Sequence, residues 1–451
     1  MNSSRRTFLK AAGAAVAFPT IIPSNVLGEN APSKTIALGQ IGCGRIARGM
    51  DMNGLMQCKG AQYVAVSDCD KNRAASGKTM LKRDVKIYQD YRDLIADKSI
   101  DAVVISTPDH WHAQPAVEAA FAKKDVYMQK PTSLTIDEGR CFAKAMALNK
   151  TVFQLGSQQR SSSQFQRACT LVRNGRLGKI LAIEIGLPGD PAGGKTDKMT
   201  VPENLNYDLW LGSTPEVYYT EDRVHPQKGF GRPGWLRCEQ FGAGMITGWG
   251  SHHLDIAHWA MGWEAMGPVT IEGKGEFHTT GLWNVHGNYD ITMMYPGDVK
   301  MRVWEKFPNG VRFIGEKGWI FVSRGSVKTT ASDPVSPGKS LKALDASDEK
   351  LLASDPASES IKLNCWTGVH QQNWVNCIKT REETNVPAET AHRSCSACLV
   401  GHIGMKLGRK LTWDYKTETF VGDAEANKLI AREERAPYGV RRAFEKLSKN
   451  A

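Results

Sequence analysis

The sequence predicts an α/β Rossmann domain followed by a larger α+β domain. Three observations predict this fold class: a glycine-rich turn directly after a short apolar strand, alternating strand-like and helix-like segments up to about residue 156, and a series of short strands joined by turns between residues 269 and 323. The chain has 451 residues, of which 41% are hydrophobic and 23% charged, which is enough apolar material for two cores.

Residues 1–28 are predicted to be an export signal. Arg5 and Arg6 precede Phe-Leu-Lys, residues 11–22 are apolar and uncharged, and a small residue, Gly28, ends the segment. The paired arginines resemble a twin-arginine signal, a route known to carry folded proteins, and predict a periplasmic location. The alternatives are a basic arm or a membrane anchor, although the apolar stretch is too short to span a bilayer. No later run is long and apolar enough to cross a membrane, so no membrane contact is expected after signal removal.

The charge and the cysteines exclude two further classes of function. The predicted signal contributes three positive charges and no negative charge to the net charge of +11, which leaves +8 on the remaining chain. The basic residues are dispersed, so no nucleic-acid partner is expected. The close pair Cys395 and Cys398 has no second cysteine pair or histidine pair at zinc-site spacing, so we interpret these thiols as buried and expect no metal site.

The first domain, residues 34–156, begins with a dinucleotide-binding turn. The strand-like run 35–41 leads into Gly-Cys-Gly-Arg-Ile-Ala at residues 42–47, the G-x-G-x-x-A form of the motif. Gly42 permits the tight turn, Gly44 allows a pyrophosphate to approach the backbone, and Ala47 allows close packing of helix on strand. The N-terminus of the following helix faces the phosphates.

An acidic residue follows the next strand, residues 62–67. Asp68 comes 24 residues after Gly44, where a carboxylate accepts hydrogen bonds from ribose hydroxyls. The alternative role for Asp68 is a helix N-cap. The carboxylate favours NAD over NADP because it repels a 2′-phosphate, although Lys71 and Arg73 nearby weaken that preference.

Polar residues also follow the later strands of this domain. Thr107 comes after the apolar strand 102–106, Gln129 and Lys130 after 125–128, and Gln158 after 151–155. Ligands bind beyond the carboxyl ends of strands in open α/β sheets.

In these residues, the chain closely resembles the Gfo/Idh/MocA family, the glucose-fructose oxidoreductase and inositol dehydrogenase type. The resemblance covers nearly everything after the predicted signal. It rests on the turn at 42–47, Ser106-Thr107-Pro108 with His112, Lys130-Pro131, and Gly242-Ala243-Gly244 leading to His252 and Asp255.

The resemblance implies a second domain with a large, open, mostly antiparallel sheet that supports homo-oligomerisation. It implies NAD as the cofactor, with NADP less favoured, and a carbohydrate or cyclitol substrate that is oxidised or reduced at a hydroxyl. Some members of the family use bound NAD for redox-assisted cleavage of glycosidic bonds. The cofactor-binding residues expected from motif and resemblance are Gly42, Gly44, Arg45, Ile46, Asp68, Thr107, Pro108, His112, Gln129, Lys130 and Gln158.

Three residues are predicted to be catalytic. The resemblance implies that Lys130 bonds the reacting hydroxyl. Without the resemblance, Lys130 would be interpreted as an ordinary exposed lysine. His252 is the predicted acid/base, and if its segment is helical Asp255 shares its face at i, i+3 and could orient it. The histidines at 253 and 258 do not form a clean i, i+4 pair with His252, which disfavours a metal site.

Two positions depart from the family pattern. Many members carry Glu where this chain has Gln129, so a charge that would tune Lys130 is absent. Many members place Asp four residues before the histidine, where this chain has Gly248. The second departure makes simple polyol dehydrogenase activity less certain.

The second domain, residues 157–415, starts with a long loop-rich region. Aromatic residues interleaved with polar residues across residues 188–241 suit sugar recognition, although packing of loops over the sheet is the alternative. Strands are expected at 269–278, 289–295, 299–306, 311–315 and 319–322, a surface loop at 324–362, helices at 370–379 and 391–410, and a tail at 416–451 that packs back on the body. The candidate substrate contacts are Arg223, His225, Arg232, Trp235 and His253.

Three functions are compatible with these features. The first is an exported NAD(P)-dependent oxidoreductase acting on a sugar or cyclitol hydroxyl, with tightly bound NAD. The second is a redox-assisted glycosidase or lyase that recycles its NAD within each turnover, which suits a compartment without a nicotinamide supply. The third is a non-catalytic sugar-binding protein, suggested by Gly248.

Overall fold

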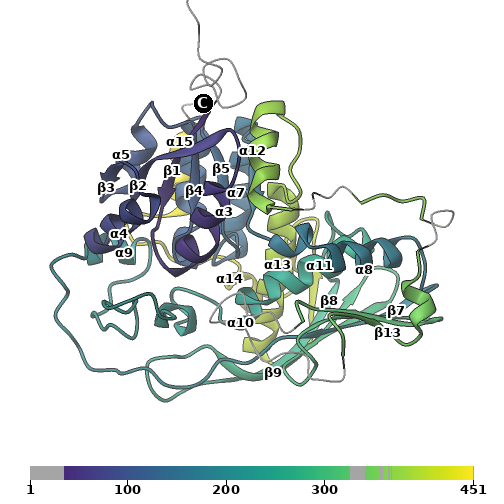
Figure 1. Ribbon diagram of the computed structural model, residues 1–451. Helices are drawn as coiled ribbons and strands as arrows, with labels where there is room; N and C mark the ends of the chain where they lie inside the picture. The colour runs from purple at the N-terminus through teal and green to yellow at the C-terminus, as the bar shows by residue number, and fades with distance from the viewer. Residues whose placement is uncertain (1–34, 326–340, 355–358, 364–365, 367, 450–451) are drawn as a thin grey trace, which may run out of the picture. The chain divides into compact units, whose positions relative to one another are not determined.

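The computed structural model describes residues 35–449 except 326–340, 355–358, 364–365 and 367 (Figure 1). The predicted export signal, residues 1–28, lies outside the described residues. No helix in the described part of the chain is long and apolar enough to cross a membrane.

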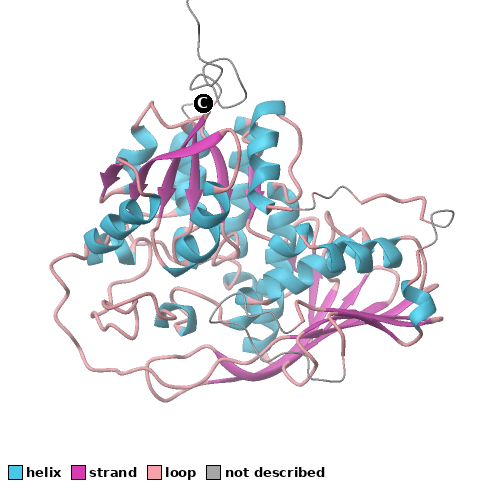
Figure 2. Cartoon of the chain, in the orientation of Figure 1, coloured by secondary structure: helices cyan, strands magenta, loops and turns pink. Residues whose placement is uncertain are grey.

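The first domain is built on a six-stranded parallel sheet with strand order β3-β2-β1-β4-β5-β6 (Figures 1 and 2). The predicted Rossmann fold is confirmed, and its apolar runs form the buried central strands. Strand β3 was not predicted because only three residues pair there and they are largely exposed. The strands are β1 (Ile36–Ile41), β2 (Ala61–Ser67), β3 (Lys86–Tyr88), β4 (Ala102–Ile105), β5 (Asp125–Met128) and β6 (Phe153–Leu155).

Helices and helical turns connect these strands. Two of them start at sequence-encoded caps: the Asp70 side chain accepts from the amides of residues 72 and 73, and Thr135 forms a capping box with Glu138. The helical elements are η3 (Ala47–Asp51), α3 (Met52–Met56), α4 (Lys71–Leu81), α5 (Tyr91–Ala96), η4 (Asp109–Trp111), α6 (Ala113–Phe121), α7 (Ile136–Asn149) and η5 (Gln158–Ser161).

The second domain contains a nine-stranded sheet with strand order β13-β12-β11-β7-β10-β9-β8-β14-β15. All pairings are antiparallel except that of β7 with β10, so the expected mostly antiparallel sheet is confirmed. Strand β7 sits in the middle of the sheet and was not singled out from the sequence. The strands are β7 (Ile180–Gly186), β8 (Thr270–Phe277), β9 (His286–Tyr295), β10 (Val299–Trp304), β11 (Gly310–Gly315), β12 (Gly318–Val322), β13 (Leu344–Ala346), β14 (Leu411–Asp414) and β15 (Thr419–Phe420).

One face of this sheet is covered by three helices, α8 (Ser163–Arg173), α11 (Gly250–Met261) and α13 (Ala388–Leu407) (Figure 2). Their apolar residues and those of the strands form the largest core, which buries Phe165, Trp259 and Phe313 among others. The opposite face carries alternating partly exposed side chains, including the ion pair of Arg302 with Asp290. The remaining helical elements are α9 (Tyr207–Leu211), η6 (Gly234–Arg237), α10 (Met245–Gly248), η7 (Glu349–Leu352), α12 (His370–Thr380), α14 (Ala424–Lys428) and α15 (Val440–Ser448).

Three late segments pack against the first domain. Trp374 of α12 lies in the core behind the parallel sheet, where its Nε1 donates to the Val152 carbonyl at 3.1 Å and its ring contacts Tyr127. Helix α15 contacts α6 and α7, and Glu418 accepts from Arg140 of α7. The boundary between the domains therefore does not follow chain order after residue 369.

The segment 324–362 was expected to be a surface loop, and this prediction was wrong in part. Residues 344–346 form strand β13 on β12, and residues 349–352 form a helical turn. The segment has little hydrophobic periodicity because its paired strand is only three residues long and all three are partly exposed.

Candidate active site

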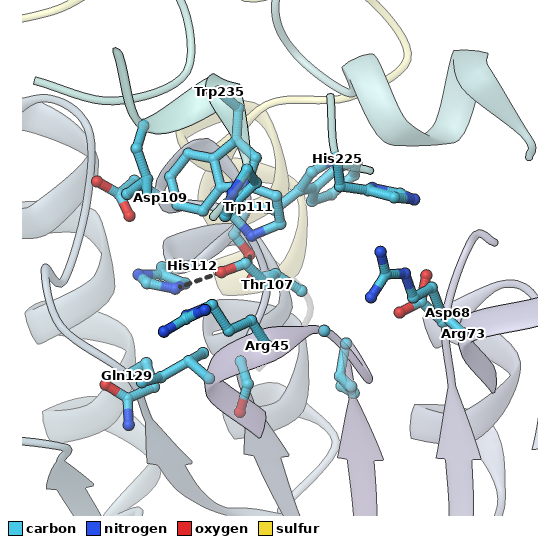
Figure 3. Close-up of a pocket in the computed structure, with 18 of the residues that line it drawn as sticks. Arg45, Asp68, Arg73, Thr107, Asp109, Trp111, His112, Gln129, His225 and Trp235 are labelled. Carbon is cyan, nitrogen blue, oxygen red and sulfur yellow. Dashed lines mark hydrogen bonds between the residues drawn. The ribbon is translucent and has the colours of Figure 1, made fainter. Parts of the chain in front are cut away.

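A pocket lies beyond the carboxyl ends of the parallel strands. Loops after β1, β2, β4 and β5 line it on one side, and segments from the second domain line it on the other, including residues 231–233, 235–236, 248–249 and 252. Figure 3 shows Asp68 and Arg73 at one end of this pocket and Asp109, His112 and Gln129 at the other. The arrangement leaves room for an extended ligand along the edge of the sheet.

The glycine-rich turn is shaped for a dinucleotide. Gly42 has φ +83°, and a Cβ atom there would lie 2.8 Å from the Ser106 carbonyl oxygen. A Cβ atom on Gly44 would meet nothing within 4 Å, so the backbone at this position faces open space. These are the conditions that close approach of a pyrophosphate requires.

Asp68 closes the far end of the turn. Its carboxylate accepts from the backbone amide of Cys43 at 2.8 Å and from that of Asp70 at 2.9 Å. Burial raises the pKa of Asp68, and these two amide hydrogen bonds oppose the rise. Asp68 therefore ties β2 to the glycine turn and also lines the pocket where a ribose would lie.

Residues 225–232 cross this end of the pocket. The Phe230 ring lies between two guanidinium groups, with Arg48 4.4 Å and Arg73 4.3 Å from its centroid. Arg45 donates to the Phe230 carbonyl at 3.3 Å, and Arg73 donates to the Pro226 carbonyl. We call residues 225–232 the strap, because they connect the second domain to three arginines of the first.

His225 was predicted to contact the substrate, and it lines the pocket at the end that holds Asp68. Its Nε2 lies 3.0 Å from Asp70 Oδ2, at the end of the pocket that holds Asp68 (Figure 3). His225 thus belongs to the ribose end of the pocket and anchors the strap.

Lys130 lies at the opposite end. Its Nζ donates a hydrogen bond of 2.8 Å to the backbone carbonyl of Gly248. Burial lowers the pKa of Lys130 to about 8, while the negative charge of Asp109 opposes this shift. A substantial fraction of Lys130 is therefore neutral near pH 8 and competent to accept a proton.

Asp109 was not singled out from the sequence, although it stands in the polar run after β4. It is buried, lines the pocket, and burial raises its pKa to about 7 against the favourable field of Lys130. Figure 3 shows Asp109 on the same side of the pocket as His112. Asp109 and Lys130 are thus two titratable groups of opposite sign whose pKa values approach each other, which is typical of proton-transfer sites.

A second buried acid explains the departure at Gln129. The Gln129 amide donates to Asp51 Oδ1 at 2.7 Å, and the Ser106 hydroxyl donates to Asp51 Oδ2 at 2.6 Å. Burial raises the pKa of Asp51 to about 7. Position 129 carries no carboxyl group, but the carboxyl group of Asp51 in η3 contacts the Gln129 side chain. Asp51 is too far from Lys130 in the sequence to be recognised from the motif around Lys130.

His112 supports the loops around the site. Its Nε2 lies 2.9 Å from the Thr107 carbonyl oxygen, and its Nδ1 lies within hydrogen-bonding distance of the Pro131 carbonyl oxygen. Burial lowers its pKa to about 4, so the neutral ring donates to one of these oxygens. Thr107, Pro108 and Gln158 line the pocket, as do Gly42, Gly44, Arg45 and Ile46.

The predicted contact between Asp255 and His252 was wrong. Asp255 instead accepts two hydrogen bonds from the buried Arg160, at 2.8 and 2.7 Å, and one from Ser394 at 2.8 Å. His252 lines the pocket, but its buried Nδ1 has no hydrogen-bond partner among the described residues. Asp255 and His252 lie on the same helix, but the hydrogen bonds from Arg160 hold the Asp255 carboxylate away from His252.

The predicted substrate contacts divide into two groups. Arg232 and Trp235 line the pocket. Arg223 and His253 are not among the residues that line it: the Arg223 guanidinium stacks on Tyr218, and the Nε2 of the buried His253 lies 2.9 Å from Asn309 Oδ1. Arg324, at the start of the segment interpreted as a surface loop, lines the pocket with its guanidinium 4.6 Å from the centroid of the Trp249 ring.

The described residues contain no group of three or more His, Cys, Asp or Glu side chains arranged to hold a metal ion. Cys395 and Cys398 lie buried in α13, where burial raises the pKa of both thiols.

The fold and the pocket define a two-domain α/β protein of the NAD-binding type. Residues 36–157 match the family model described as "Oxidoreductase family, NAD-binding Rossmann fold", and residues 192–318 and 360–440 match that of the "Oxidoreductase family, C-terminal alpha/beta domain". The chain belongs to the Gfo/Idh/MocA oxidoreductase family. Its first domain is an NAD-binding Rossmann domain of that family, as expected from the sequence.

Curated relatives match part of the chain. An uncharacterized oxidoreductase, YrbE, of Bacillus subtilis is 31% identical over 175 residues, which cover 39% of this chain and 48% of the relative. An inositol 2-dehydrogenase of Burkholderia multivorans is 27% identical over 200 residues, which cover 43% of this chain and 59% of the relative. The matched regions thus span about half the length of these relatives.

Solved structures match the fold over most of the chain. The WlbA dehydrogenase of Chromobacterium violaceum, in complex with NADH and UDP-GlcNAcA, has a TM-score of 0.62 and 15% identity and covers 84% of this chain and 96% of its own. Levoglucosan dehydrogenase, in complex with NADH and levoglucosan, has a TM-score of 0.58 and 14% identity and covers 86% of this chain and 100% of its own.

Proposed function

We propose that the protein is an NAD-dependent oxidoreductase that acts on a hydroxyl group of a sugar or cyclitol. The observation that carries the proposal is Lys130: its Nζ is fixed by the Gly248 carbonyl in the same pocket as the dinucleotide turn, beside Asp109 and His252. The family relatives named as inositol 2-dehydrogenases, and the fold neighbours solved with a sugar or a sugar nucleotide, support this substrate class.

The residues at the glycine turn fit NAD. Gly42 allows the tight turn, Gly44 leaves the backbone open to the pyrophosphate, and Asp68 lines the pocket where the adenosine ribose would lie. When bound, NAD⁺ supplies the hydride acceptor.

The chain's own residues handle the proton. Lys130 donates to or accepts from the reacting hydroxyl, and its lowered pKa gives a neutral amine that accepts the hydroxyl proton near pH 8. Asp109 then balances the positive charge that forms on Lys130. His252 presents its ring to the same pocket, and burial together with the charges of Arg324 and Lys130 lowers its pKa, so it acts as a neutral hydrogen-bonding group.

A specific observation favours a second candidate, the redox-assisted glycosidase or lyase. The strap packs against three arginines around the glycine turn, an arrangement that would slow exchange of a bound dinucleotide. An enzyme that oxidises a sugar, eliminates its aglycone, adds water to the resulting double bond and then returns the hydride needs no exchange of the cofactor; the lyase omits the addition of water.

One measurement separates the candidates. The purified protein is denatured and the released NAD(H) is quantified, then the native protein is assayed on sugars with added NAD⁺ and on aryl glycosides without it. NADH formation from free sugars supports the oxidoreductase. Aryl glycoside cleavage without added NAD⁺, by protein that retains stoichiometric NAD, supports the second candidate. Protein that neither contains nor binds NAD would contradict both.

We further propose export by the twin-arginine route and assembly into a homo-oligomer through the uncovered face of the second sheet. Replacing Arg5 and Arg6 by lysine should trap the protein in the cytoplasm. Light scattering of the mature protein should give a multiple of the chain mass, and a monomer would contradict the oligomer.

A further inference from the structure

We propose that the substrate carries an anionic group, the carboxylate of a sugar acid or a sugar phosphate, which binds in the space beside Gly248 between Arg232 and Arg324. This inference rests on the proposed function and names the substrate class of the same pocket.

Arg232 lines the pocket and has hydrogen-bonding capacity that the described residues do not use. Its nearest carboxylate is Asp190, whose Oδ1 lies 3.7 Å away and also lies 3.6 Å from Arg237. Asp190 Oδ2 accepts a hydrogen bond of 2.8 Å from the backbone amide of Met245. The buried Nε of Arg232 has no hydrogen-bond partner among the described residues. Two arginines therefore share one buried carboxylate, which leaves positive charge in excess.

Arg324 brings a second cation from another part of the chain. It follows β12 and stacks on the Trp249 ring at 4.6 Å. Its field helps to lower the pKa values of Lys130 and His252, which places its charge close to the reacting end of the pocket. A guanidinium stacked on an aromatic ring keeps its N–H edge in plane for a bidentate contact with a carboxylate or phosphate.

Gly248 leaves open space between these cations. A Cβ atom there would meet only Met245, with Sδ at 3.7 Å and Cε at 4.0 Å, both ordinary contacts. Met245 Sδ in turn lies 3.9 Å from Arg232 Nη2, and the residue after Gly248 is the tryptophan that carries Arg324. The Gly248 carbonyl holds Lys130. An anion in this space therefore faces both arginines and lies next to the lysine.

The phosphates of the cofactor do not account for these two arginines. The glycine turn offers its own open backbone at Gly44, and Arg73 lies beside Asp68 at that end of the pocket (Figure 3). Arg232 and Arg324 come from the second domain and border Met245 and Trp249 instead. Asp109 is the acid that lines this end of the pocket in the described residues, and its charge acts on Lys130.

The experiment compares matched ligands on the NAD-loaded protein. The ligands are D-glucuronate against D-glucose, D-galacturonate against D-galactose, and D-glucose 6-phosphate. Initial rates give kcat/KM, and calorimetry on the protein saturated with NADH gives Kd without turnover. We expect at least one acid or the phosphate to exceed its neutral partner by about 100-fold in kcat/KM and in affinity. A preference for the phosphate would assign the anion to a phosphate group, and a preference for an acid would assign it to a carboxylate.

Variants test the position of the anion. Arg232→Gln and Arg324→Gln should each reduce the ratio of kcat/KM for the anionic ligand to kcat/KM for its neutral partner about 10-fold, mainly through the KM of the anionic ligand. Arg237→Gln is the matched control, because Arg237 shares Asp190 but does not line the pocket, and it should change the preference by less than about 3-fold. Gly248→Asp places a carboxylate in the open space and should reverse the preference; thermal melting confirms that each variant is folded.

The outcomes separate this inference from the proposed function. Equal kcat/KM and equal Kd for the acids, the phosphate and the neutral sugars, or binding of the neutral sugars alone, would overturn the anionic substrate while the oxidoreductase stands. A protein that retains no NAD and reduces none in the presence of any of these sugars overturns the proposed function itself.

Discussion

Lys130, which follows the carboxyl end of β5 in the first domain, donates a hydrogen bond of 2.8 Å from its Nζ to the backbone carbonyl of Gly248, at the end of α10 in the second domain. This bond fixes the amine at the reacting end of the pocket although position 248 carries no side chain. The main chain thus positions Lys130 through residue 248, where the resemblance to the family leads us to expect an aspartate.

Removing this amine should abolish turnover without releasing the cofactor. In Lys130→Ala the group that contacts the reacting hydroxyl is lost, while Gly42, Gly44 and Asp68 at the far end of the pocket are untouched. We expect kcat to fall at least 10²-fold, the usual contribution of a positioned acid or base. The Kd for NAD, measured by calorimetry, should change by less than about 3-fold. Normal turnover in Lys130→Ala would rule out the assignment.

The pH profile should report the pair of Lys130 and Asp109. Sugar oxidation requires a deprotonated acceptor, so kcat/KM should rise with pH and level off above the lowered Lys130 pKa of about 8. The negative charge of Asp109 raises the Lys130 pKa, so Asp109→Asn should move the midpoint to lower pH. An unmoved midpoint would show that the two groups are not coupled, and complete loss of activity would make Asp109 the proton acceptor.

The sequence predicted those parts of the fold and the site that depend on neighbouring residues. The glycine turn, the buried parallel strands and the polar strand ends are all local patterns, and the pocket forms where these strand ends meet. Contacts between distant residues were missed. Asp51 lies behind Gln129 and Arg324 lies in the pocket because of tertiary packing, and Asp255 faces Arg160 rather than its helical neighbour His252. Helical spacing places the side chains of His252 and Asp255 on one face, but the carboxylate is oriented by the buried cation of Arg160 with which it pairs.

Asp68 should set the preference between NAD and NADP. Its carboxylate lines the ribose end of the pocket together with Arg73, so loss of its negative charge leaves a net positive site for a 2′-phosphate. In Asp68→Asn, which keeps an oxygen acceptor for the Cys43 amide, we expect the ratio of the NADP affinity to the NAD affinity to rise about 10-fold. Titration of each nucleotide by calorimetry measures this ratio, and an unchanged ratio would mean that Asp68 only ties the turn to β2.

Asp255 should be required for stability rather than for proton transfer. Its pair with Arg160 is buried on both sides, so Asp255→Ala leaves an unpaired buried guanidinium and should lower the free energy of unfolding by about 3–5 kcal/mol. The control is Asp290→Ala, whose pair with Arg302 is about a third exposed and should contribute about 0–1 kcal/mol. Urea denaturation measures both variants. A stable Asp255→Ala protein that has lost only its activity would restore the catalytic role predicted from the sequence.

The strap should control how long the cofactor stays bound. Phe230 fills the space between Arg48 and Arg73 at the end of the pocket that holds Asp68, so its removal frees both guanidinium groups and loosens residues 225–232. In Phe230→Ala we expect the NADH dissociation rate, followed by nucleotide fluorescence after dilution, to rise about 10-fold, because each cation–π contact contributes about 0.5–1 kcal/mol and the ring also covers apolar surface. Phe307→Ala is the matched control, since that ring contacts Trp304 at the end of β10, away from the pocket. Faster NADH release in Phe230→Ala alone would show that the strap retains the cofactor, which supports the internally recycled reaction. Equal release rates in the two variants would mean that the glycine turn and Asp68 retain the cofactor instead.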